Sequence, residues 1–230
     1  MTEENSNLNT WRSGKLAIAL VVMLALALVT LAYIISRMPY EVAYKSRTEE
    51  GFLERSTVVL YGVAFIICLI VVFVNRWRTG FYVATLLLAF SLREMDFHIR
   101  PTTTDRVEKI TSTRYWRSGD VGLLEKLIIL IILIAIATTI VKYLRGSSPR
   151  WLADLKRGRP YAISVAGFGL FMLTGFMIDN QLSMDALDNP VVLFLSLVEE
   201  CIEVGIPIMA CIALVQWAKT DCPKPVQIKP

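Results

Sequence analysis

Residues 190–218 read PVVLFLSLVEECIEVGIPIMACIALVQWA, an apolar run that carries three glutamates and no basic residue. A run of this length exceeds the roughly 20 residues that an α-helix needs to cross the hydrocarbon core of a bilayer. An ionised carboxylate near the bilayer centre costs about 2.5 kcal/mol or more. Glu199, Glu200 and Glu203 therefore mark a candidate functional site inside a predicted transmembrane helix.

The composition of the whole chain is that of a polytopic membrane protein. Of its 230 residues, 55% are hydrophobic, and the mean hydropathy is +0.54. Both values are too high for an ordinary soluble domain, and the apolar residues gather in long uncharged blocks. Three of these blocks have the length of a membrane span: residues 16–36, 56–74 and 160–178. We assign the net charge of +4 to loops beside anionic lipid and expect no nucleic-acid partner.

The other predicted spans are not free of charge. Residues 79–92 are too few to cross alone and reach full length only by including the hexapeptide Arg93–His98. Residues 127–141 likewise reach full length only when 121–126 or 142–144 are added, so Glu125 and Lys126 lie in the first turns of this span. The sequence thus predicts an all-α bundle of six transmembrane helices in a single membrane domain. Their approximate ranges are 15–36, 56–75, 79–98, 121–144, 160–178 and 190–218.

The loops predict the orientation of these helices. Residues 75–78 and 145–159 are rich in arginine and lysine, which places them in the cytoplasm. With six spans, both termini are then cytoplasmic, including the tail 219–230, and residues 99–120 form an extracytoplasmic loop. We therefore expect an integral protein of a bacterial inner membrane.

Two local patterns refine this topology. The first apolar block follows Arg12 and Lys15, as in a signal peptide, but it is long and has no clear cleavage site, so we expect an uncleaved anchor. Within 145–159, Ser148 and Pro149 are expected to begin a short helix that lies on the lipid interface.

Two charged clusters are predicted to lie at similar depth. Glu94 lies about 21 Å along its helix from Gly80, and Glu203 lies about 20 Å from the start of its own helix at Pro190. The three glutamates of 190–218 are three and four residues apart, so they share one side of the helix. Pro207 removes a backbone hydrogen bond beside them and predicts a kink there. A tilt of this helix would bring both clusters to one cavity in the outer half of the membrane.

A divalent metal is the first chemistry that fits this cavity. Carboxylates combined with one imidazole suit zinc, manganese or iron. The predicted ligands are Glu199, Glu203, Asp96 and His98, the last being the only histidine in the chain. A bound metal could then activate water for the hydrolysis of a lipid or another membrane-borne substrate.

In such a hydrolase, further charged residues would have catalytic roles. Glu200 or Glu94 is the predicted general base, and Lys126 or Arg93 would orient an anionic group of the substrate. The chain contains no nucleotide-binding loop, serine-hydrolase elbow or zinc-protease motif. The enzyme class therefore depends on the carboxylate cluster alone.

Two other chemistries stay open. The acids could be protonated and couple proton or cation movement to a substrate, as in a carrier or channel subunit. Alternatively, Arg93, Lys126 and Arg100 could neutralise them in buried ion pairs that only determine helix packing, as in a non-catalytic accessory subunit. The expected partners are the lipid bilayer, a lipid substrate, and a second copy or other subunits of a membrane complex.

Overall fold

The computed structural model describes residues 3–47, 51–77, 79–94, 116, 122–179 and 189–220. Its regular elements in these ranges are all α-helices, so the predicted all-α class is confirmed. The helices are α1 (Glu3–Ser36), α2 (Tyr40–Arg47), α3 (Phe52–Asn75), α4 (Gly80–Glu94), α6 (Leu123–Lys156), α7 (Pro160–Asp179) and α8 (Pro190–Thr220). The eight-residue α2 was not predicted.

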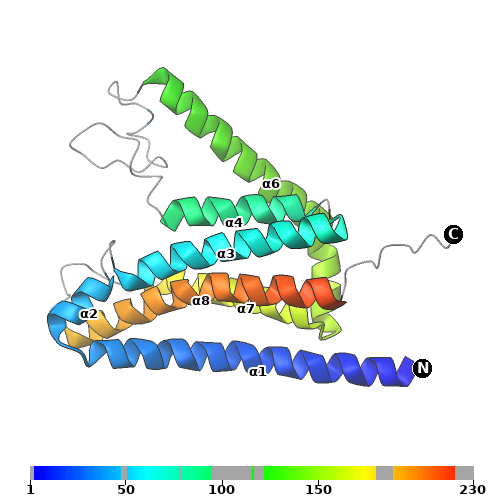
Figure 1. Ribbon diagram of the computed structural model, residues 1–230, viewed down its shortest axis with the longest axis horizontal. Helices are drawn as coiled ribbons and strands as arrows, with labels where there is room; N and C mark the ends of the chain where they lie inside the picture. Colours follow the sequence, from blue (N-terminus) through cyan, green and yellow to red (C-terminus); the bar gives the residue numbers. More distant parts are fainter. Residues whose placement is uncertain are drawn as a thin grey trace.

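The long helices alternate in direction (Figure 1). At one end of the bundle α3 passes into α4 and α6 passes into α7. We call this the basic end because the connecting residues 76–79 and 157–159 are rich in arginine. The beginning of α1 and the end of α8 lie at the same end. Successive long helices are therefore antiparallel, as a chain that repeatedly crosses a membrane requires.

Within the part of the chain that the structure describes, three helices are long and apolar enough to cross a membrane: Ser13–Ser36, Phe52–Asn75 and Pro160–Ile178. They coincide with the three uncharged blocks of the sequence. Large apolar side chains such as Leu16, Met23 and Leu26 remain exposed on the outside of α1. Such a surface is unfavourable in water and ordinary in lipid. The chain is therefore membrane-embedded.

Helix α8 lies against α1, α3 and α7. Its Leu197, Cys201 and Met209 are fully buried, and small residues on the neighbouring helices, such as Ala32 and Ala64, let the backbones approach closely. The glutamates of α8 are thus held inside the bundle by the most closely packed helix of the fold.

Helix α6 differs from its prediction. It runs without a break from Leu123 to Lys156, so the separate helix expected to begin at Ser148 is wrong, although Pro149 lies within the helix. A proline there removes one hydrogen bond and bends a helix without ending it when the next turns continue. Figure 1 shows α6 turning near its C-terminal end to cross the basic end of the bundle. The predicted helix 79–98 ends at Glu94 within the described residues, and 95–98 lie outside them.

Candidate functional site

The last turn of α4 meets the middle of α8 through one arginine. Arg93 Nε lies 3.7 Å from Glu94 Oε1, and Arg93 Nη2 lies 3.6 Å from Glu203 Oε1. A single guanidinium therefore lies between the two carboxylates that the depth estimate had placed at the same level. We call Glu94, Glu199, Glu200 and Glu203 the carboxylate cluster.

The two carboxylates are more buried than the arginine that binds them. The side chain of Glu94 is 10% exposed and that of Glu203 is 27% exposed, whereas that of Arg93 is 58% exposed. A long arginine side chain can keep its guanidinium near the bundle surface while its nitrogen atoms contact buried acids. The guanidinium is therefore accessible at the bundle surface while its two carboxylate partners lie further inside.

Tyr61 of α3 completes this region, and the sequence analysis did not identify it. The tyrosine is buried, its ring stacks on Phe90 with the ring centres 5.7 Å apart, and it interacts electrostatically with Glu94, Arg93 and Glu203. Thr57, one turn earlier on α3, is also buried. Their spacing of four residues places both polar side chains on one side of α3. Because neither residue is charged, they do not stand out in the sequence of this span.

Ser196 extends the polar stripe of α8. It precedes Glu199 and Glu200 by three and four residues and Glu203 by seven, which places all four on the same side of the helix. Ser196 is fully buried, and its Oγ forms no hydrogen bond with any described residue. Glu199 and Glu200 are partly buried. The stripe could have been identified from this spacing, but serine is common in helices and we predicted no role for it.

The metal prediction finds no support among the described residues. No three histidine, cysteine, aspartate or glutamate side chains in the described ranges come together in a way that could hold an ion. Glu203 contacts Arg93 instead, and a cationic partner competes with a metal for the same oxygen atoms. Two of the predicted ligands, Asp96 and His98, lie outside the described residues, as does Arg100.

Lys126 of α6 has a structural contact. Its ammonium group donates a hydrogen bond to the carbonyl oxygen of Trp116, over 3.2 Å. This bond ties the first turn of α6 to the segment before it. The roles predicted for Lys126 in orienting a substrate, and for Glu200 and Glu94 as a general base, stay predictions.

A cavity of about 730 Å³ lies between α4, α6, α7 and α8, and Phe90 is part of its lining. We call it the basic-end cavity because Trp77 and Trp217, which stack with their ring centres 4.0 Å apart, line it near that end of the bundle. It reaches inward to Phe90 and Phe168, whose rings meet edge to face. From Tyr82 to Phe90 the cavity follows α4 for about 12 Å.

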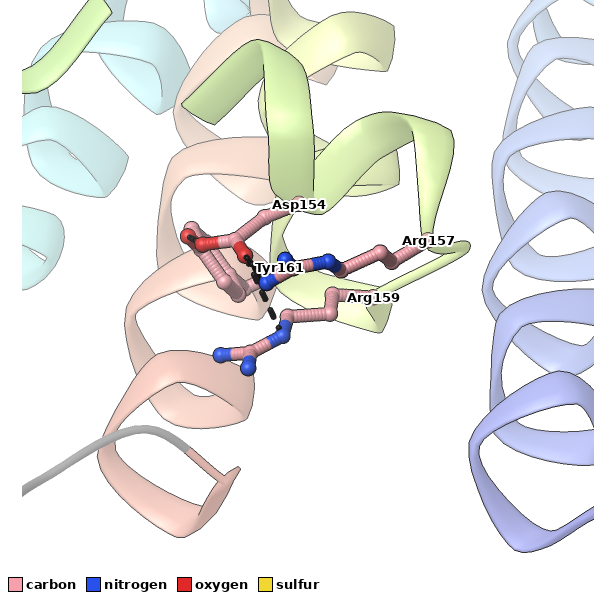
Figure 2. A network of polar contacts seen from close by, with 4 residues as sticks. All are labelled: Asp154, Arg157, Arg159 and Tyr161. Carbon is pink, nitrogen blue, oxygen red and sulfur yellow. Dashed lines mark hydrogen bonds and ion pairs between the residues drawn. The ribbon is translucent and has the colours of Figure 1, made fainter. Parts of the chain in front are cut away.

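A polar network borders the cavity where α6 passes into α7 (Figure 2). The buried carboxylate of Asp154 accepts a hydrogen bond from the Tyr161 hydroxyl and lies 3.2 Å from Arg159 Nε and 3.9 Å from Arg157 Nη1. Two guanidinium groups and one hydroxyl thus surround the buried carboxylate and satisfy its oxygen atoms. The network connects the end of α6 to the first turn of α7.

Comparison with protein-family models, curated proteins and solved structures finds no match to this chain. Chemically, the described site combines carboxylates, a guanidinium, a phenol and a buried hydroxyl inside a membrane bundle. These groups can exchange protons, bind a cation, or bind an anion at Arg93.

Proposed function

We propose that the chain crosses a plasma membrane six times, with both termini in the cytoplasm, and acts as a proton- or cation-coupled carrier. In a bacterium this would be the inner membrane. The basic residues of 75–78 and of 145–159, the latter comprising the end of α6 and the turn to α7, support this orientation, because the cytoplasmic ends of membrane spans carry an excess of lysine and arginine. The basic-end cavity would then open toward the cytoplasmic side.

The observation that carries this proposal is the position of Phe90. Its ring lines the basic-end cavity and also stacks on Tyr61, which interacts with Arg93, Glu94 and Glu203. One aromatic layer thus separates a cavity at one end of the bundle from an ion-pair site deeper within it. A carrier needs such an arrangement, in which a site is reached from one side while a thin barrier closes the other.

The ion pair provides a coupling step. If a proton or a bound cation neutralises Glu203, Arg93 loses its partner on α8 and keeps Glu94, which is on its own helix. The contact between α4 and α8 would then depend on the coupling ion. Phe90 lies one turn before Arg93 on α4, so a shift of α4 would also move the aromatic barrier. Among the described residues, Tyr61, Glu199 and Glu200 are further ionisable groups of this region.

Ion flux in vesicles tests the proposal. The full chain is reconstituted with an entrapped pH-sensitive dye, and the decay of an imposed pH gradient is followed with sodium or potassium as counter-ion. We expect faster decay than in protein-free vesicles, loss of this effect in Glu203→Gln, and no change in Glu41→Gln. The control makes the same carboxylate-to-amide change on the exposed surface of α2. Equal decay with and without the wild-type protein would exclude the carrier.

A hydrolase acting on a lipid or other membrane-borne substrate is the second candidate. Two observations favour it: the buried Ser196 hydroxyl on the stripe of the carboxylate cluster, and the exposed Arg93, which could contact an anionic substrate. Mass spectrometry of lipids after incubation with the wild type and with Glu199→Gln would detect a product. Elemental analysis of the same samples tests the zinc, manganese or iron hypothesis, and no stoichiometric metal would exclude it.

If neither flux nor product appears, and Glu203→Gln only lowers thermal stability or releases a co-purifying protein, the accessory-subunit alternative is correct. The Arg93 to Glu203 ion pair would then serve only to pack α4 against α8.

A further inference from the structure

The basic-end cavity has the size and the polarity of a ligand site. Its volume of about 730 Å³ falls within the roughly 300–1,000 Å³ of small-molecule pockets. Apolar side chains such as Val83, Leu87, Val165 and Leu214 line the deeper part. These residues come from three helices, α4, α7 and α8, so the apolar part lies within the bundle. A linear hydrocarbon chain fits such a lining.

Two cations, Lys142 and Arg150 of α6, belong to the same lining. Both side chains are exposed, and neither forms an ion pair with any residue in the described ranges. Lysine and arginine side chains are long enough to bring two charges toward one group even when their backbones are separated. The cavity therefore offers positive charge that the neighbouring part of the protein does not neutralise.

Asp154, which also lines the cavity, does not pair with Lys142 or Arg150. Asp154 is 3% exposed and is occupied by Arg157, Arg159 and the Tyr161 hydroxyl (Figure 2). Its carboxylate is thus compensated by residues other than Lys142 and Arg150. Charge complementarity therefore favours an anionic ligand.

The aromatic residues indicate the depth of the charged part. Trp77, Trp151 and Trp217 line the cavity, and Trp151 Nε1 donates a hydrogen bond of 3.1 Å to the carbonyl oxygen of Ala162. Tryptophan gathers where lipid headgroups begin, because its ring is apolar and its N–H needs an acceptor. The cations consequently lie at headgroup depth, with the apolar part extending toward the bilayer centre.

We propose that the basic-end cavity binds one anionic lipid, with its phosphate held by Lys142 and Arg150 and one acyl chain directed between α4, α7 and α8 toward Phe90. This lipid site includes neither the ion pair of Arg93 nor the carboxylate cluster. The lipid site is therefore independent of the hydrolase and accessory-subunit alternatives, whereas in a carrier the lipid would share the cavity that Phe90 lines.

Lipid retention in the wild-type protein is the first test, and it needs no substitution. The full chain is purified in a mild detergent and exchanged against phosphatidylglycerol or against phosphatidylcholine with the same acyl chains. Native mass spectrometry then counts the bound lipids. We expect one phosphatidylglycerol per chain to be retained and phosphatidylcholine to be lost. Equal retention of the two lipids would overturn the proposal.

Variants of α6 locate the site. Lys142→Gln combined with Arg150→Gln should weaken phosphatidylglycerol binding by about 30-fold, the combined effect of two basic residues beside an anionic lipid. Arg145→Gln combined with Lys156→Gln removes the same charge from exposed positions of the same helix that do not line the cavity, and it should retain the lipid. Equal weakening by both pairs would show that only the overall charge matters and would overturn the proposal.

A competition experiment distinguishes a lipid from a free anion. Inorganic phosphate added in excess should not displace phosphatidylglycerol, because the acyl chain contributes part of the binding. Ala213→Phe narrows the apolar part of the cavity, and it should lower lipid retention while Lys142 and Arg150 are intact. Displacement by phosphate alone would assign the cations to a soluble anion, and the discovery of a bound peptide or a second copy in the cavity would also overturn the lipid assignment.

Discussion

Replacing Asp154 by asparagine should weaken the connection between α6 and α7. The side chain of Asp154 is 3% exposed and accepts from Tyr161 while it lies 3.2 Å from Arg159 Nε and 3.9 Å from Arg157 Nη1. Asparagine has nearly the same shape and can still accept the Tyr161 hydrogen bond. The substitution therefore removes the negative charge and leaves the packing unchanged.

The expected loss of stability follows from these contacts. A hydrogen bond to a charged group contributes about 1.5–3 kcal/mol and one to a neutral group about 0.5–1.5 kcal/mol, so the bond to Tyr161 loses roughly 1 kcal/mol. Arg159 is 32% exposed, so its ion pair contributes at most about 1 kcal/mol. Arg157, which is 69% exposed, adds nothing measurable. The total is roughly 2 kcal/mol, which lowers the melting temperature by about 4–8 °C.

A double-mutant cycle with Tyr161→Phe measures the pairwise part of this loss. Reversible unfolding in mixed detergent micelles gives the free energy of unfolding for the wild type, Asp154→Asn, Tyr161→Phe and the double variant. We expect the sum of the losses in the two single variants to exceed the loss in the double variant by about 1 kcal/mol. Glu41→Gln is the control, since it makes the same chemical change on the exposed surface of α2.

Additivity would contradict this prediction. If the losses of unfolding free energy in the two single variants add up to the loss in the double variant within about 0.3–0.5 kcal/mol, Asp154 and Tyr161 act independently. The Tyr161 hydroxyl then does not stabilise the charge of Asp154. A loss in Asp154→Asn no larger than that in Glu41→Gln would likewise show that the network does not stabilise the connection between α6 and α7.

Three further substitutions test the packing of the bundle. Gly14→Ala should destabilise the protein by about 1–3 kcal/mol, because its methyl group would overlap the backbone carbonyl oxygen of Gly158, whereas Gly62→Ala meets nothing within 4 Å and should gain about 0.5–1 kcal/mol of helix stability. Equal stability of these two variants in detergent unfolding would refute the close approach of α1 to the turn before α7. Ser164→Ala should lose about 0.5–1.5 kcal/mol, because the Ser164 hydroxyl donates a 2.8 Å hydrogen bond to Gln216 Oε1 across α7 and α8. An unchanged free energy of unfolding would show that this bond does not form in the membrane.

The sequence predicted best those helices that have a long uncharged apolar run. The uncharged blocks 16–36, 56–74 and 160–178 coincide with the three candidate membrane spans, because a long apolar run has few alternatives to a helix in lipid. The span predicted to end at residue 144 continues to Lys156, and the separate helix predicted to begin at Ser148 is part of it. A proline such as Pro149 can either begin a helix or bend one, and only the surrounding packing decides which occurs.

The candidate site could be predicted only along single helices. Glu199, Glu200 and Glu203 share one side of α8 because their spacing requires it, and Ser196 follows from the same rule. The predicted approach of Glu94 to this helix depended on an assumed tilt, and in the structure Arg93 joins the two. The metal ligands Asp96 and His98 stay predictions, as they lie outside the described residues.

The sequence by itself determined that the chain is an α-helical membrane protein with an acidic stripe on its last long helix, because apolar length and helical spacing are properties of neighbouring residues. Only the tertiary structure decided that Arg93 contacts Glu203, 110 residues further along the chain, and that Phe90 lines a cavity while it stacks on Tyr61. It also decided that Asp154 forms an ion pair with Arg159, whereas Lys142 and Arg150 line that cavity. These contacts depend on which helices are neighbours, and in a bilayer many helices expose similar apolar surfaces, so hydrophobicity alone does not select the pairs.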